Sequence, residues 1–190
     1  MAEQQMIKNG IVGVGDICNT SDTLFQKQKA NLQYYSFIEV FGVQDEKINK
    51  IIFKAMALRA QFRKSGLQST ISPHSPYSVP PKLMQEIARN FDKADELFSI
   101  HIQETLAENE LFEKKKGDFL AWLKSIKASP EIWEGRNKST DILKELENKK
   151  ALLVHNTFAI KKDISSNYYC TCPKANLYIE NVLPNYSIFD

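Results

Sequence analysis

The sequence has almost no excess of charge of either sign, because 25 basic and 23 acidic side chains leave a formal net charge of +2. A protein that binds nucleic acid or an anionic membrane surface normally concentrates positive charge. Neither is therefore a favoured partner of this chain. Segment 47–64 is locally basic, but its pattern is typical of a helix with one solvated face.

Long hydrophobic runs are also lacking, and none approaches the roughly 20 residues that a membrane-spanning helix needs. The polar first ten residues do not resemble a signal peptide. Cysteine is scarce and odd in number, with three residues, which favours free thiols in a reducing compartment. We therefore expect a cytoplasmic protein. Cys170 and Cys172 are predicted to share one face of a strand rather than to clip a metal, since no second ligand pair accompanies them.

Histidine is equally scarce, but its placement is regular. Each of the three histidines closes a short apolar or β-favouring run: residues 69–74, 97–101 and 151–155. If these runs are neighbouring parallel strands, their imidazoles lie on one rim of the sheet and converge on one site.

Between these runs, β-favouring and helical segments alternate along the whole chain. Expected strands are 11–17, 34–42, 67–72, 97–100, 150–154 and one beginning at Tyr168; expected helices are 23–33, 45–65, 80–92, 139–148 and 159–165. Such alternation favours an α/β fold with a parallel sheet and outer helices. A closed TIM-type barrel needs eight βα units and about 250 residues. We predict one domain over residues 1–190, an incomplete TIM-type (β/α) barrel of about six βα units, with a helical insertion at about 105–149. An open doubly wound sheet is the alternative.

Three features have two interpretations. Glu39 lies inside an apolar run, so it is either a site residue or a carboxylate paired in the core. His74 and Tyr77 lie in a proline-rich segment that either lines a pocket or forms a simple turn. Trp122 and Trp133 either cover the mouth of the site or pack on the exterior of the barrel.

The segment from Leu97 to Phe112 contains the strongest chemical signal. A strand ends at His101, and Glu104 follows three residues later, before a helix-favouring stretch. At the carboxyl end of a barrel strand these residue types are suited to binding a metal and transferring a proton. The alternative is a histidine at a strand end and a glutamate near the positive end of a helix.

The motifs GIVGVGDI, SPHSPYS, SIHIQETLAENELF, LLVHNTF and CPKANLYIENVLP occur in this order. Together they resemble the amidohydrolase superfamily, in the branch of deaminases and chlorohydrolases that includes S-adenosylhomocysteine and aminofutalosine deaminases. The resemblance implies a metal-dependent hydrolase that deaminates a small aminated purine or nucleoside-like substrate with an activated water. Zinc is the implied metal, with iron and manganese as alternatives.

The resemblance also implies roles for four residues. His101 binds the metal, Glu104 is the proton shuttle, His155 contacts the attacking water or the departing group, and His74 lies in the substrate pocket. We expect Tyr77, Glu39 and Asn176 in the same pocket.

Two parts of the family pattern are missing from this sequence. The family has an H-x-H pair on its first strand and an Asp ligand on its eighth, so the chain corresponds to strands two to seven. We expect this chain alone to hold zinc poorly and to deaminate little, because catalytic zinc normally takes three protein ligands. The alternative function is a non-catalytic partial barrel. Its open edges would associate with a second copy or with a complementing chain.

Overall fold

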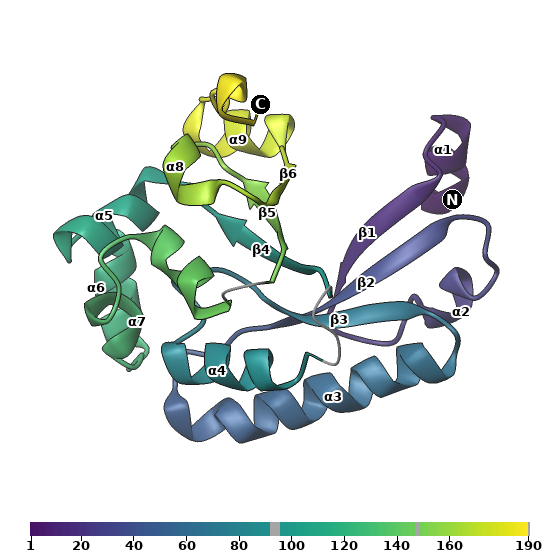
Figure 1. Ribbon diagram of the computed structural model, residues 1–190, viewed down its shortest axis with the longest axis horizontal. Helices are drawn as coiled ribbons and strands as arrows, with labels where there is room; N and C mark the ends of the chain where they lie inside the picture. The colour runs from purple at the N-terminus through teal and green to yellow at the C-terminus, as the bar shows by residue number, and fades with distance from the viewer. Residues whose placement is uncertain (92–95, 147–148, 190) are drawn as a thin grey trace.

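The structure is a computed structural model that describes residues 1–91, 96–146 and 149–189. In this part of the chain, six strands alternate with helices, as the sequence predicts (Figure 1). The strands are β1 (Gly13–Cys18), β2 (Gln33–Val40), β3 (Gln68–Pro73), β4 (Phe98–Ile102), β5 (Ala151–His155) and β6 (Tyr168–Cys170). All the strand pairings are parallel, so the carboxyl ends of neighbouring strands lie at the same edge.

The six strands form two three-stranded sheets, in the orders β1-β2-β3 and β4-β5-β6. Hydrogen bonds from the backbone of β4 help to join the sheets: the His101 N–H donates to the His74 carbonyl over 2.9 Å, and the Ser99 N–H donates to the Ser72 hydroxyl over 3.2 Å. Because a side chain takes the second of these donors, the regular ladder is interrupted between β3 and β4. The prediction of parallel α/β alternation is confirmed. The described residues do not close a barrel, and the two sheets diverge from their junction (Figure 1).

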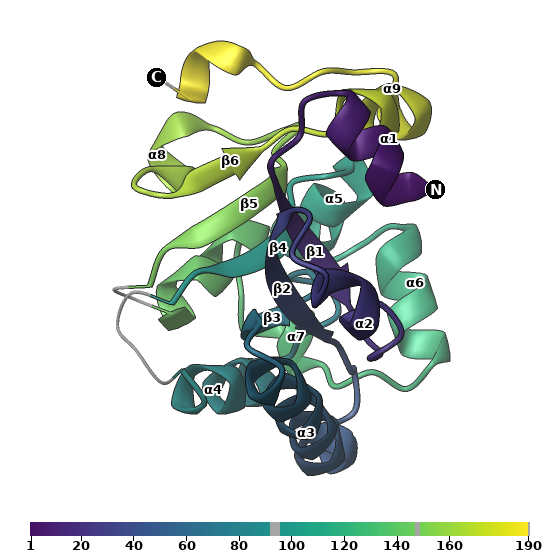
Figure 2. The ribbon, with the colours of Figure 1, turned by 90° about the vertical axis from the view of Figure 1, so that its right-hand side faces the viewer.

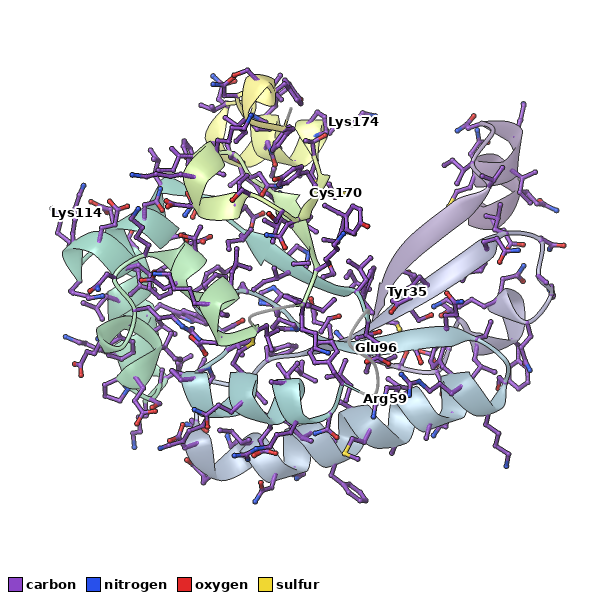
Figure 3. All side chains as sticks on the ribbon, viewed as in Figure 1. Tyr35, Arg59, Glu96, Lys114, Cys170 and Lys174 are labelled. Carbon is purple, nitrogen blue, oxygen red and sulfur yellow. The ribbon has the colours of Figure 1, made fainter. Side chains whose placement is uncertain are left out.

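Successive side chains of β2 point alternately to the two faces of the sheet, and helices cover one of these faces. Ile38 and Val40 are buried in the core together with residues of α3 (Ile48–Lys64), which runs along that face beside α4 (Pro81–Arg89) (Figure 2). Tyr35 and Glu39 therefore face the other side of the sheet. Tyr35 lies where the two sheets diverge (Figure 3), and its hydroxyl is 3.3 Å from the Leu97 carbonyl that it bonds.

Helix α3 follows directly from its sequence pattern. Ile48, Ile52, Ala55 and Phe62 recur at helical spacing and are buried in the main core. Basic residues occupy the last turn, where they complement the negative end of the helix, and Gly66 follows with φ of +76°. The burial of this stripe fixes α3 against β2 and β3.

The segment between β4 and β5 folds into α5 (Leu106–Lys114), α6 (Asp118–Ser125), α7 (Glu131–Glu134) and the 3-10 helix η2 (Ser139–Leu146). Leu111, Phe112, Leu123 and Ile132 form an apolar cluster separate from the main core. Trp133 belongs to this cluster and is 5% exposed, whereas Trp122 is 48% exposed. Trp133 therefore packs inside the insertion, and both interpretations of Trp122 stay predictions.

The remaining helices are short: α1 (Ala2–Lys8), α2 (Leu24–Lys27), α8 (Lys161–Ile164), α9 (Pro173–Glu180) and the 3-10 turns η1 (Asp45–Lys47) and η3 (Tyr186–Phe189). Within the described ranges, no helix is both long and apolar enough to cross a membrane.

The predicted helix at 23–33 is wrong beyond its first turn. Only α2 is helical, and β2 already begins at Gln33. Tertiary pairing overrides the helical propensity of the segment, because the Gln33 N–H donates to the Val12 carbonyl over 3.0 Å at the start of the pairing of β2 with β1. Ala30 then leaves the helical region with φ of +55°.

Three other details also differ. Cys172 lies outside β6 and precedes α9, so it does not share a strand with Cys170. The helix predicted at 139–148 is a 3-10 helix over Ser139–Leu146. The predicted end at Asn148 lies outside the described residues. Helix α4 ends at Arg89, and the predicted end at Asp92 also lies outside them.

Candidate metal-dependent active site

The carboxyl ends of four strands bring the candidate site together. Glu39 lies near the end of β2, His74 directly follows β3, His101 lies in β4, and His155 ends β5. The His74 and His101 ring centroids are 5.2 Å apart, and those of His101 and His155 are 5.6 Å apart. The three imidazoles thus form a row along one rim, which is the arrangement that their positions in the sequence indicate.

Glu39, His74 and His101 are the closest group of potential metal ligands among the described residues. One ligand atom of each lies within 4.8 Å of the others. Oε1 of Glu39 is 3.7 Å from Nδ1 of His101, and the Glu39 side chain is only 10% exposed. The position of Glu39 beside a site histidine favours the interpretation as a site residue over that of a carboxylate paired in the core. Two imidazoles and a carboxylate are a donor set that suits zinc, iron or manganese, so the residues present fit a divalent metal.

The backbone fixes the orientation of the His101 ring. Its Nδ1 lies 3.0 Å from the His74 carbonyl oxygen. A carbonyl can only accept, so Nδ1 donates in this bond and Nε2 is the ring nitrogen left for another contact. The same carbonyl accepts the backbone N–H of His101, which ties β4 to the end of β3.

Two hydroxyl groups hold the His74 ring. Its Nδ1 is 2.8 Å from the Ser78 hydroxyl and 3.0 Å from the Ser75 hydroxyl. Burial lowers the pKa of His74 below its usual value, and the nearby Glu39 carboxylate only partly opposes this shift. His74 is therefore neutral at neutral pH, with a nitrogen lone pair available to a ligand.

Tyr77 lies between the site and the insertion. Its ring meets His74 edge-on, with centroids 5.9 Å apart, and packs against Phe119 of α6 at 4.8 Å. Burial raises the pKa of Tyr77 to about 12, so its hydroxyl stays protonated at neutral pH.

Glu104 and His155 form a close acid–base pair. Oε1 of Glu104 lies 3.3 Å from Nε2 of His155. On the other side of the ring, Nδ1 of His155 is 2.9 Å from Oδ1 of the fully buried Asn176, which accepts its proton. Asn176 also donates to the His155 carbonyl over 3.4 Å. Its side chain thus orients the imidazole so that Nε2 faces the carboxylate.

His155 has an unusual backbone conformation, with φ of +77°, and Asn156 follows with φ of +56°. Residues with a Cβ atom rarely adopt this left-handed region. The sharp turn directs the His155 side chain from the end of β5 toward Glu104.

Sequence reasoning did not identify Glu108, a fully buried carboxylate close to the site. Its Oε1 accepts the Gln103 N–H over 2.9 Å, and its Oε2 accepts the Glu104 N–H over 3.3 Å. Burial raises the pKa of Glu108 to about 7. The spacing Thr105 to Glu108 is that of a helix capping box, and the Thr105 side chain accepts the Glu108 N–H, so this signal could have located it.

Arg136 is a second residue that sequence reasoning did not identify. Its guanidinium donates to the carbonyls of Pro76 and Val79 over 2.9 and 2.8 Å, and it pairs with Glu145 over 2.7 Å. Its side chain is 2% exposed. Arg136 therefore fastens the loop that carries His74 and Tyr77 to the insertion. No local pattern in the sequence marks this long-range contact.

A barrel-like series of parallel strands with histidines and glutamates at their carboxyl ends defines a class, and comparison with known proteins agrees with it. Residues 4–186 match the Amidohydrolase family, and the chain belongs to this family. It is 23% identical over 184 residues to the aminodeoxyfutalosine deaminase of a Nitratiruptor species, covering 93% of this chain and 45% of that protein.

Solved structures show the same fold. The aminofutalosine deaminase of Helicobacter pylori superposes with a TM-score of 0.79 at 23% identity, over 98% of this chain and 50% of that one. The guanine deaminase of C. acetobutylicum, with bound guanine, gives a TM-score of 0.60 at 15% identity, over 84% and 38%. The chain thus spans about half the length, or less, of these relatives.

Proposed function

We propose that this chain carries part of the active site of a metal-dependent hydrolase that deaminates an aminated purine or nucleoside-like substrate. The observation that carries the proposal is the Glu104–His155 pair, 3.3 Å apart, beside the His101 ring on the adjacent strand. Family membership and relatives named as deaminases support this reaction class.

His101 is the proposed centre of the metal site, with zinc as the proposed metal and iron or manganese as alternatives. A divalent cation there would supply a Lewis acid and would lower the pKa of a nearby water molecule to about 7. The His101 ring, held through Nδ1, would present Nε2 to such a cation.

Glu104 is the proposed proton shuttle. It would accept a proton from the attacking water and deliver it to a ring nitrogen of the substrate, which is general acid–base work. His155, oriented by Asn176, would hydrogen-bond the oxygen that adds to the ring. Tyr77 and Asn176 stay our proposed substrate-side residues, since Tyr77 presents a protonated hydroxyl and an aromatic ring beside the row of histidines.

A second candidate function is a non-catalytic partial barrel that binds a second copy or a complementing chain. The observation in its favour is that, in the described sheets, β1 and β6 each pair with a single strand. Apolar side chains near these edges are exposed, including Val12 at 79% and Tyr168 at 52%. For the catalytic function we propose a small-molecule substrate, and for either function we propose no nucleic-acid or membrane partner and a cytoplasmic location.

An ammonia-release assay on adenosine-type nucleosides tests the catalytic proposal. The zinc-supplied chain is assayed alone and together with a protein segment that carries an H-x-H strand and an Asp-ended strand of a deaminase relative. We expect little ammonia from the chain alone and clear turnover from the mixture. A mixture that assembles, as shown by sedimentation, but releases no ammonia from any aminated purine would favour the non-catalytic function.

A further inference from the structure

Two of the three cysteines lie one residue apart beside the candidate site, and the proposed reaction uses neither of them. Cys170 is the last residue of β6, and Cys172 directly precedes α9. Both are free thiols that are partly accessible, whereas the third cysteine, Cys18, is a buried free thiol. Strand β6 pairs with β5 alone in the described sheets, and Cys170 lies on this outer strand (Figure 3).

The two thiols are neighbours in space as well as in sequence. The pKa of Cys172 is raised above its usual value, first by burial and then by the charge of Cys170 and a hydrogen bond between the two side chains. A disulfide joins residues whose Cα atoms are about 4.4–6.8 Å apart. Residues two apart in a chain are separated by at most about 7 Å, so a modest bend at Thr171 is enough to join this pair.

Cys172 is also part of the structure that orients His155. Its carbonyl accepts the Asn176 N–H over 2.9 Å in the first turn of α9. The Asn176 side chain in turn bonds Nδ1 of His155 over 2.9 Å. A change of the backbone at Cys172 therefore alters the contact that fixes the His155 ring.

We infer that Cys170 and Cys172 are a site of reversible oxidation, at which a peroxide converts the two thiols into an intrachain disulfide. This modification goes beyond the proposed function and does not depend on it. In a reducing compartment, disulfides are usually transient and often sense the redox state. A disulfide that closes a ring of only three residues is strained, and strained disulfides are the ones that are easily reduced again.

The oxidation has two steps. The raised pKa of Cys172 leaves little thiolate at neutral pH, so the first attack is assigned to Cys170. Its thiolate attacks hydrogen peroxide: an S–O bond forms, the O–O bond breaks and hydroxide leaves, which gives a sulfenic acid. The Cys172 sulfur then attacks the Cys170 sulfur: the S–S bond forms, the S–O bond breaks, and hydroxide takes the Cys172 proton and leaves as water. Together the thiols lose two electrons and two protons, and the peroxide becomes two water molecules.

The disulfide changes the site through α9. Closing the small ring bends the chain at Thr171 and redirects the Cys172 carbonyl, which then no longer accepts the Asn176 N–H in the same geometry. The first turn of α9 loosens, and Asn176 holds the His155 ring less firmly. The oxidised chain should therefore differ from the reduced chain at His155.

Mass spectrometry tests the disulfide directly. Trypsin cuts after Lys162 and Lys174, so one peptide, 163–174, contains both cysteines of the pair and not Cys18. The full chain is treated with hydrogen peroxide, and the remaining thiols are alkylated in denaturant before digestion. We expect peptide 163–174 to lose two hydrogen atoms and escape alkylation, and to regain both thiols after treatment with dithiothreitol. Cys18 is the internal control, because burial raises its pKa to about 11 and should keep it reduced.

Serine variants test the pairing. Cys170→Ser and Cys172→Ser should each abolish the intrachain disulfide. Cys18→Ser is the matched control and should leave the disulfide in peptide 163–174 unchanged. Circular dichroism of each variant confirms that it is folded.

The link to the site is read from the imidazole nitrogens of the ¹⁵N-labelled chain, which has only three histidines. Their resonances are assigned with the single variants H74Q, H101Q and H155Q. We expect peroxide to shift the resonances of His155 and leave those of His74, at the other end of the row, in place. The shift should be absent from Cys172→Ser and should reverse with dithiothreitol.

Two outcomes would overturn the inference. Peptide 163–174 that gains oxygen atoms, or that cross-links to a second chain, instead of losing two hydrogen atoms would show that the pair does not form this disulfide. A disulfide that leaves the His155 resonances in place would reject the link to the site. Neither measurement uses turnover, so a complemented chain that releases no ammonia would reject the proposed function alone.

Discussion

At the scale of single residues, the chemistry of the site depends on which atoms of each side chain are already engaged. Asn176 takes the Nδ1 proton of His155, so the ring nitrogen facing Glu104 can only share a proton with that carboxylate. A carboxylate and an imidazole 3.3 Å apart are suited to passing a proton between water and a substrate.

Replacement of Glu104 by Gln should remove the proton shuttle and leave metal binding intact. In the complemented protein we expect kcat to fall by about 10² to 10⁴-fold, the contribution of a general acid–base group. Stopped-flow or endpoint ammonia release gives kcat, and elemental analysis gives the metal content. Glu113→Gln, at an exposed position of α5, is the matched control. Near-normal turnover in Glu104→Gln with unchanged metal would exclude Glu104 from the mechanism.

At the scale of elements, a buried carboxylate fastens the turn between β4 and α5. Glu108 accepts the backbone N–H groups of Gln103 and Glu104, and the Gln103 amide donates to Asn109 over 2.8 Å and to the Ser139 hydroxyl of η2. Gln103 itself has φ of +54°, a conformation that this network must hold. The position of Glu104 thus depends on the first turn of α5.

The raised pKa of Glu108 has a consequence for stability. Its value of about 7 in the folded chain exceeds the ordinary value of 4.5, so the folded state binds the proton more tightly than the unfolded state. The stability should therefore fall as pH rises from about 4.5 to about 7 and level off above, by up to roughly 3 kcal/mol from this group. Urea unfolding at pH 5 and pH 8 should show a smaller difference in Glu108→Gln than in the wild type. Equal differences in both proteins would contradict this assignment.

Arg136 also links two parts of the fold, the insertion and the loop that follows β3. Arg136→Met should leave the buried carbonyls of Pro76 and Val79 without donors, at a cost of about 1–3 kcal/mol per unsatisfied group. We expect a lower melting temperature and faster amide exchange in residues 74–79, measured by mass spectrometry. Arg89→Met removes an arginine that is 67% exposed and serves as the control. Unchanged exchange in residues 74–79 of the Arg136→Met variant would show that the loop keeps its conformation without this side chain.

The elements that the sequence predicts well are those whose signal is local. The runs that end in His101 and His155 and the stripe of α3 are visible as β-favouring or helical patterns, and the rim of histidines follows from them. The error at 23–33 arose because the bond of the Gln33 N–H to the Val12 carbonyl, where β2 begins to pair with β1, is tertiary. The sequence did not identify Arg136 for the same reason, since its carbonyl partners lie 57 and 60 residues away.

At the scale of the whole molecule, two small parallel sheets meet where β3 lies beside β4 and diverge from this junction. Strand β1 pairs along its length with β2 alone, so its other edge presents unpaired backbone groups in the described structure. Such an edge favours pairing with another chain.

Association through this edge predicts a concentration-dependent increase in mass, measurable by analytical ultracentrifugation. Ile17→Lys places a charge on β1 at a position 38% exposed and should shift the equilibrium toward the monomer, since charged side chains discourage edge pairing. Ala60→Lys on the exposed side of α3 is the control for added charge. Equal association of both variants and the wild type would locate the contact elsewhere.

The left-handed backbone of His155 implies a conflict between folding and chemistry at one position. A φ of +77° costs a residue with a Cβ atom on the order of 1–2 kcal/mol, and glycine avoids most of this cost. Selection for stability alone would therefore favour a residue other than histidine at the end of β5. The imidazole thus lies at a position that its own backbone disfavours, and variants recovered in a screen for heat resistance should include losses of His155 more often than losses of His101, whose φ is not in that region.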